Sequence, residues 1–125
     1  MLSNKTYGQN SEEAAAGFLR RKGYKILERN FRTRMGEIDI IARHKGTLVF
    51  VEVKARRSLR YGHAKLALTP AKQRTLTLIA LTYLKKYGLG NTPARFDVVT
   101  LQTVDGRTQF ELFANAFEPA SLDQE

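Results

Sequence analysis

Three carboxylates and a lysine interrupt two otherwise apolar runs within residues 36–54, namely Glu37, Asp39, Glu52 and Lys54. Carboxylates are costly to bury in such a setting unless a cation or strong donors accompany them. A divalent ion such as Mg²⁺ meets this need, because it takes one or two carboxylates and leaves positions for water and phosphate oxygens. The pattern therefore predicts a metal-assisted hydrolytic site, with Asp39 and Glu52 as metal ligands.

Two further side chains are predicted to complete this site. Lys54 lies two residues after Glu52, on the same face of a strand, where it can hold the attacking water or neutralise the transition state. Glu12 is expected at the start of a helix over about residues 10–22, N-capped by Ser11, and can supply another carboxylate. The adjacent Glu13 is an alternative to Glu12 as the inward residue.

Glu37 has two interpretations. It shares the predicted Asp39 face, so it is a candidate ligand, but a salt bridge to Arg34 or Arg56 explains it equally well. The alternation also gives the two strands an aliphatic face that should pack on a helix, formed by Ile38, Ile40, Ala42, Val49, Val51 and Val53.

The charge balance favours a polyanionic partner. The net charge is +9, and residues 20–74 contain 16 Lys/Arg against 4 Asp/Glu. Three of those four acids belong to the predicted site, so basic residues surround it, as phosphate binding requires. We expect contacts to nucleic acid from Arg34, Arg56, Arg57, Arg60 and Lys72. Lys72 and Gln73 begin a helix, whose N-terminus attracts anions, although an exposed polar face is the alternative.

The hydrophobic periodicity predicts one α/β domain over residues 1–125, with flexible termini at 1–9 and 118–125. After the first helix come strands at 24–32, 36–42 and 47–55, with a turn at 43–46 between the last two. A basic loop follows at 56–68, then a helix that begins at Thr69-Pro70, and strands at 95–102 and 108–114. The order α-β-β-β-α-β-β contains a β-α-β unit, which implies a mixed sheet flanked by helices.

Several classes are excluded or disfavoured by composition. The chain has no cysteine, so it has no disulfide or thiolate metal site. No apolar run is long enough for a membrane span or a signal peptide, and a cytoplasmic protein without a membrane partner is expected. His44 and His63 have no metal-ligand spacing, and Asp97, in the middle of a strand, suits a structural hydrogen bond.

Several short motifs of the chain resemble those of a known family. The runs Gly36-Glu37-Ile38-Asp39 and Val51-Glu52-Val53-Lys54, with Asn30-Phe31-Arg32 and Arg95-Phe96-Asp97, resemble the YraN-like family of small bacterial proteins. Asp39 followed by Glu52-x-Lys54 is similar to the D…(D/E)xK core of the restriction-endonuclease-like nucleases, and the preceding helix glutamate is similar to that of archaeal Holliday junction resolvases. Ser11 departs from the glycine expected before that glutamate.

This resemblance implies a restriction-endonuclease-like fold and a metal-dependent endonuclease that uses Mg²⁺ or Mn²⁺. The implied site is Glu12, Asp39, Glu52 and Lys54, and the implied substrate is DNA, including branched DNA. A homodimer is consistent with cutting two strands. Two alternatives remain open: an RNA-directed nuclease, and a nucleic-acid-binding module with a vestigial site.

Overall fold

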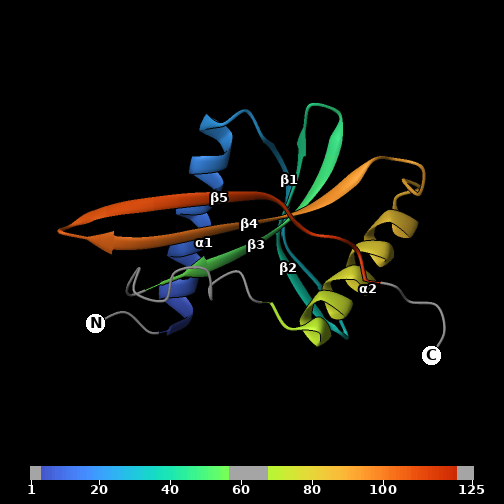
Figure 1. The fold of residues 1–125 in the computed structure, drawn as a ribbon, viewed down its shortest axis with the longest axis horizontal. Coiled ribbons are helices and arrows are strands. Elements are labelled where there is room, and N and C mark those ends of the chain that lie inside the picture. Colours follow the sequence, from blue (N-terminus) through green and yellow to red (C-terminus); the bar gives the residue numbers. More distant parts are fainter. Residues whose placement is uncertain (1–3, 57–67, 121–125) are drawn as a thin grey trace.

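The computed structural model describes residues 4–56 and 68–120 of the chain (Figure 1). The predicted element order is confirmed. The elements are α1 (Asn4–Arg21), β1 (Lys25–Thr33), β2 (Gly36–His44), β3 (Thr47–Ala55), α2 (Pro70–Lys86), β4 (Ala94–Val104) and β5 (Arg107–Phe117). Most of the basic loop predicted at 56–68, including Arg57, Arg60 and His63, lies outside the described residues.

The five strands form one mixed sheet in the order β1-β2-β3-β4-β5. Neighbouring strands pair antiparallel except for β3 and β4, which are parallel, as the predicted β-α-β unit requires. Parallel strands need a long crossover connection, and α2 lies within it. The two helices lie on opposite sides of the sheet (Figure 1).

The central strand β3 is buried on both faces. Val49 and Val51 belong to the apolar cluster that contains Ala15, Ala16 and Leu19 of α1. Leu48 and Phe50 belong to the opposite cluster, with Leu76, Ile79 and Tyr83 of α2. Because an apolar cluster covers each face of β3, its sequence is almost continuously apolar. Glu52 and Lys54, on the α2 face, are the polar interruptions that the fold must accommodate.

The start of α2 is set by local chemistry, as predicted. The Thr69 hydroxyl accepts a hydrogen bond of 3.0 Å from the Lys72 backbone N–H, and Pro70 occupies the first turn. The start of α1 was predicted wrongly, because the helix begins at Asn4. Ser11 is therefore a buried residue inside the helix and not its N-cap.

One predicted strand face is also wrong. Ile38 packs in the cluster of α2, whereas Ile40 and Ala42 pack in the cluster of α1. Pairing between β2 and β3 runs from His44 back to Ile40, opposite Val51, and stops there. Simple alternation assumes an unbroken ladder, and β2 leaves β3 just before Ile40, at Asp39. The β2–β3 turn is also shorter than predicted, since β2 continues to His44.

Candidate functional site

The site forms where β2 and β3 separate. The Asp39 carboxylate accepts a hydrogen bond of 2.8 Å from the Val53 backbone N–H, across the gap between the two strands. Val53 is the residue between Glu52 and Lys54, so this bond fixes Asp39 beside both predicted partners. A side-chain oxygen thus takes the position that a backbone carbonyl would occupy in a continued ladder.

Three carboxylates from two elements converge at this point. One oxygen each of Glu12, Glu37 and Asp39 lies within 4.8 Å of the others, and all three residues are half-buried. Glu12 comes from α1, whereas Glu37 and Asp39 come from β2. A donor set made only of carboxylate oxygens suits a hard divalent cation such as Mg²⁺ or Mn²⁺.

The electrostatics of this cluster disfavour three free negative charges. Burial, then the charge of Glu52, raises the pKa of Asp39 to about 8, against the lowering effect of the Val53 N–H; the charges of Glu12 and Glu37 raise it further. Burial and the charge of Glu37 likewise raise the pKa of Glu12. A bound cation would relieve the repulsion that both shifts reflect.

Glu52 lies next to this cluster and is paired with lysines. Its carboxylate is 3.4 Å from Nζ of Lys54 and 3.9 Å from Nζ of Lys72 at the start of α2. Glu52 is only 8% exposed. The charge of Glu52 acts on Asp39. The third carboxylate of the close trio is nevertheless Glu37, and Glu52, which the sequence predicted as a ligand, is not part of it. The carboxylate trio therefore lies beside a lysine–glutamate pair, and the Asp39–Val53 hydrogen bond connects the two.

The structure gives Glu37 both of the expected kinds of neighbour. It pairs with Arg32 at 3.0 Å, a partner that the sequence analysis did not name, and it also lies in the carboxylate trio. Arg32 and Glu37 are opposite each other in the β1–β2 ladder, a register that the sequence alone does not reveal. Glu13 points away from the trio and pairs with Arg29, so Glu12 is the inward residue of α1.

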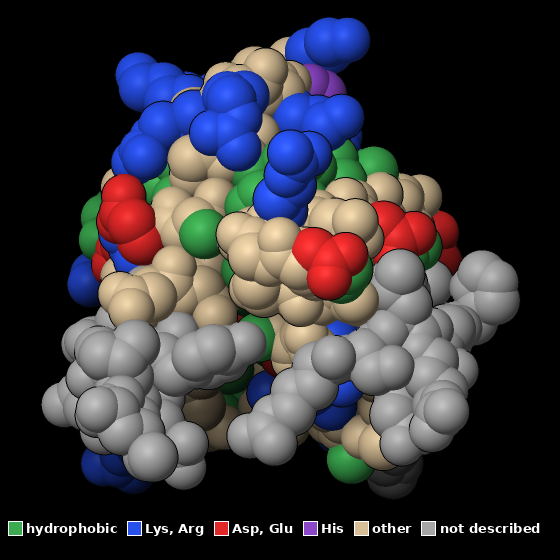
Figure 2. All heavy atoms as spheres, turned by 90° about the vertical axis from the view of Figure 1, so that its left-hand side faces the viewer, with side chains coloured by type: hydrophobic (Ala, Val, Ile, Leu, Met, Phe, Trp, Pro, Cys, Tyr) green, Lys and Arg blue, Asp and Glu red, His purple; other side chains and the backbone are tan. Residues whose placement is uncertain are grey.

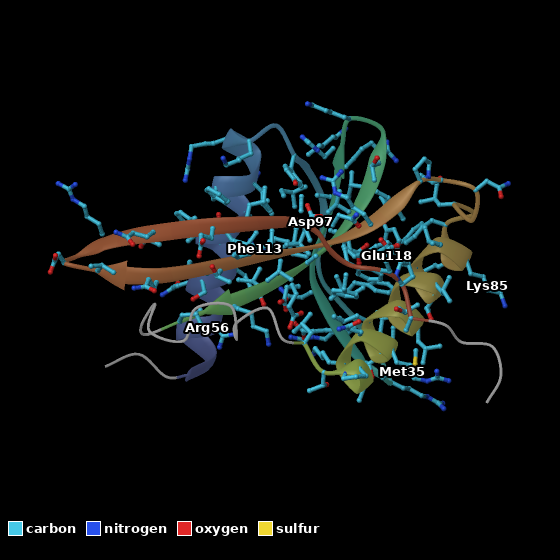
Figure 3. All side chains as sticks on the ribbon, in the orientation of Figure 1. Met35, Arg56, Lys85, Asp97, Phe113 and Glu118 are labelled. Carbon is cyan, nitrogen blue, oxygen red and sulfur yellow. The ribbon has the colours of Figure 1, made fainter. Side chains whose placement is uncertain are left out.

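The described residues that were predicted to contact phosphate lie in three different segments. Arg34 is exposed in the turn between β1 and β2, and Lys72 is close to Glu52. Arg56 directly follows β3 (Figure 3). Its backbone N–H donates to the Leu101 carbonyl at 2.7 Å. The Gln73 side chain donates to the Leu68 carbonyl at 2.9 Å, so it is committed to the beginning of α2.

One residue beside the carboxylates was missed by sequence reasoning. The Asn30 side chain hydrogen-bonds Glu12, which opposes the rise in the pKa of that carboxyl. Asn30 sits in β1 with a φ of 55°, a left-handed conformation that asparagine tolerates better than most residues. Its neighbours Arg29 and Phe31 pair with Ile40 and Ile38, which places Asn30 opposite Asp39. No spacing pattern could have indicated this role, because it depends on register and on a helix from elsewhere.

Comparison with known proteins places the chain in a family. The family model described as "Uncharacterised protein family UPF0102" matches residues 11–101, and the chain belongs to this family. The YraN-like resemblance is thereby confirmed at the level of the family.

Relatives match along most of the chain. A UPF0102 protein of Desulfosudis oleivorans is 53% identical over 112 residues, which is 90% of this chain and 89% of the relative. A UPF0102 protein of Geobacter metallireducens is 50% identical and aligns over 95% of this chain and 98% of its own. Among the described residues, neither helix has the length and apolar character needed to cross a membrane.

Proposed function

We propose that the protein is a metal-dependent endonuclease that hydrolyses phosphodiester bonds in DNA, including branched DNA. The observation that carries this proposal is the convergence of Glu12, Glu37 and Asp39 within 4.8 Å, beside the Glu52–Lys54 pair, in a chain of net charge +9. A cluster of half-buried carboxylates in a strongly basic protein has the charge pattern of a phosphate-cleaving site. The resemblance to D…(D/E)xK nucleases supports the same reading.

Each side chain has a role in this proposal. Asp39 and Glu12 would hold Mg²⁺ or Mn²⁺, with Glu37 or Glu52 as a further ligand. When bound, such a cation polarises a phosphate oxygen and lowers the pKa of a water. Lys54 donates a hydrogen bond to the attacking water or to the phosphate as negative charge develops. Glu52 holds the Lys54 ammonium group in place, since the two are 3.4 Å apart.

Binding of the substrate is assigned to the surrounding cations. Arg34 in the β1–β2 turn, Arg56 directly after β3 and Lys72 in the first turn of α2 would contact phosphates, with Arg57 and Arg60 adding to them. Such contacts position the backbone without reading sequence, which suits an enzyme that recognises the shape of a branched substrate. Salt-sensitive binding is therefore expected.

The experiment that tests this function is a cleavage panel. Labelled four-way junction, flap, linear duplex, single-stranded DNA and RNA are incubated with Mg²⁺, Mn²⁺ or EDTA. Wild type is compared with Asp39→Asn and Lys54→Ala, and with Lys85→Ala as a matched control, because Lys85 is an exposed lysine at the far end of α2 (Figure 3). We expect metal-dependent cutting that is lost in the first two variants and retained in Lys85→Ala.

The other outcomes identify the alternatives. If wild type cleaves RNA and none of the DNA substrates, the substrate is RNA and the proposal of DNA is wrong. No cleavage of any substrate by wild type, with salt-sensitive binding that survives in Asp39→Asn and Lys54→Ala, would reject the nuclease and favour a binding module.

A further inference from the structure

A surface hollow lies at the opposite end of β2 from the carboxylates. It has a volume of about 680 Å³, and its polar lining includes Lys22, Tyr24, His44, Thr47 and Arg95. No acidic side chain is among the described residues that line it. The hollow is therefore open to an anion, and nothing in the endonuclease site accounts for it.

Arg95 is held rigidly at this hollow. Its Nε donates to Asp97 Oδ1 at 2.9 Å, and its Nη2 contacts the other Asp97 oxygen at 3.3 Å and the Tyr24 hydroxyl at 3.0 Å. Asp97 is 1% exposed, near the middle of the molecule (Figure 3), and also accepts from the Asn115 backbone N–H at 2.8 Å. The remaining nitrogen, Nη1, has no hydrogen-bond partner among residues 4–56 and 68–120. A fixed guanidinium with a spare donor is prepared for an oxyanion.

His44 adds a second fixed donor. Its Nδ1 is 3.1 Å from Nη2 of Arg95. Because arginine only donates, a hydrogen bond between these two atoms requires Nδ1 to accept, which leaves the proton of a neutral imidazole on Nε2. The ring stacks on Tyr24 with centroids 4.3 Å apart, which fixes its orientation. Within the part of the chain that the structure describes, Nε2 has no hydrogen-bond partner.

The surroundings of this hollow are positively charged. Lys22 is exposed at its rim, and Arg20 and Arg21 occupy the last turn of α1. Lys25 and Arg43, directly opposite each other in the β1–β2 ladder, are like charges that destabilise the pair. Figure 2 shows Lys and Arg side chains gathered at the top of the molecule, where α1 ends and β2 turns into β3 in Figure 1. This concentration of cations is unfavourable without an anionic partner.

We propose that the Lys22–His44–Arg95 hollow binds a phosphate group of the nucleic-acid backbone. The assignment of this phosphate to nucleic acid rests on the proposed function. The presence of the hydrogen-bond donors in the hollow does not. His44 is five residues after Asp39 on β2, so the two sites are about 17 Å apart along the strand. That separation corresponds to about five base-pair steps of a duplex. The hollow would thus hold the same duplex at a second phosphate, away from the bond to be cut.

The test is a DNA-binding measurement in EDTA, which needs no cleavage. The affinity of wild type for a labelled duplex is measured by fluorescence anisotropy over a series of salt concentrations. Lys22→Ala removes a charge, so it should weaken binding and reduce the salt slope by about 1. His44→Phe keeps the stack on Tyr24 and removes the Nε2 donor, so it should weaken binding about 2- to 10-fold. Lys85→Ala is the matched control for general charge loss.

The outcomes are distinct from those of the cleavage panel. Circular dichroism of each variant establishes that it is folded. If Lys22→Ala and His44→Phe bind the duplex as Lys85→Ala does, the proposal is wrong, whether or not the protein cuts DNA. Titration with inorganic phosphate and with a nucleoside monophosphate tests whether the hollow instead binds a small phosphate compound. Binding of either small molecule that is lost in His44→Phe, with unchanged duplex binding, would overturn the assignment to the nucleic-acid backbone.

Discussion

Asp39 on β2 accepts a hydrogen bond from the Val53 backbone N–H on β3 at 2.8 Å, at the place where these strands cease to pair. This single contact joins the two halves of the proposed site. It brings the carboxylate trio next to Glu52 and Lys54, which lie on either side of Val53. It also explains the buried position of Asp39, since a backbone donor compensates part of the cost of burying a carboxylate.

The first prediction concerns pH and the stability of the metal-free protein. The pKa of Asp39 is raised from 3.8 to about 8, so the folded state binds this proton more tightly than the unfolded state. The contribution of Asp39 to stability is therefore complete below pH 4 and is lost as pH rises toward 8. Asp39→Asn keeps an oxygen for the Val53 N–H and has no charge to gain. In EDTA it should match wild type near pH 4 and below, and exceed its unfolding free energy near pH 8 by roughly 1–3 kcal/mol.

Chemical denaturation across this pH range measures the difference directly. Addition of Mg²⁺ or Mn²⁺ at pH 8 should reverse the order, because a ligand that binds only the folded state raises its stability. If Asp39→Asn is less stable than wild type at pH 8 in EDTA, the ionised Asp39 carboxylate does not destabilise the folded protein, and the prediction is wrong.

The second prediction separates two adjacent glutamates. Glu12→Gln removes a carboxylate from the trio, whereas Glu13→Gln removes only the pairing with Arg29. Calorimetric titration with Mn²⁺ should show an affinity about 10- to 100-fold lower for Glu12→Gln, and an affinity close to wild type for Glu13→Gln. Equal losses in the two variants would contradict the assignment of Glu12 as the inward residue.

The third prediction tests the positioning role of Asn30. Asn30→Gly tolerates the φ of 55° but cannot bond Glu12, so Mn²⁺ affinity should fall about 10-fold. Asn115→Gly is the matched control, because Asn115 has a φ of 52° in β5 and is not in the carboxylate group. The two proteins should have similar unfolding free energies. If both bind Mn²⁺ as wild type does, the Asn30–Glu12 bond has no role in the site.

The fourth prediction concerns the network behind the surface hollow. The Tyr24 hydroxyl donates to Asp97 at 2.7 Å, and Tyr24 is 4% exposed. Tyr24→Phe would leave a buried carboxylate short of a donor, and should lower the free energy of unfolding by about 1–3 kcal/mol. Tyr87→Phe, at a position 48% exposed, should change it by less than about 0.5 kcal/mol. Urea denaturation of both variants makes the comparison, and equal stabilities would refute the network's importance.

Local patterns predicted much of this fold. Thr69-Pro70 begins α2 because an N-cap hydroxyl and a proline in the first turn act within a few residues of each other. The alternation of Val49 and Val51 with Phe50 predicted the two faces of β3, because that strand pairs continuously with β4. The role expected for Asp97 was also right, since it is a buried hydrogen-bond acceptor.

Features that depend on contacts between distant segments were not predicted. Ile38 faces α2 because β2 leaves β3 at Asp39, and the Asp39–Val53 bond across that gap is tertiary. The Arg32–Glu37 pair and the opposition of Asn30 and Asp39 both follow from the β1–β2 register. Register is set across the sheet, so a pattern within one strand cannot fix it.

Anomalous diffraction from crystals soaked in Mn²⁺ would show directly whether these carboxylates hold a divalent cation. We expect a peak bonded to Asp39 and Glu12, with Glu37 or Glu52 as a further ligand, and no such peak in Asp39→Asn crystals. A wild-type crystal with no Mn²⁺ at this group, or a peak that persists unchanged in Asp39→Asn, would contradict this expectation.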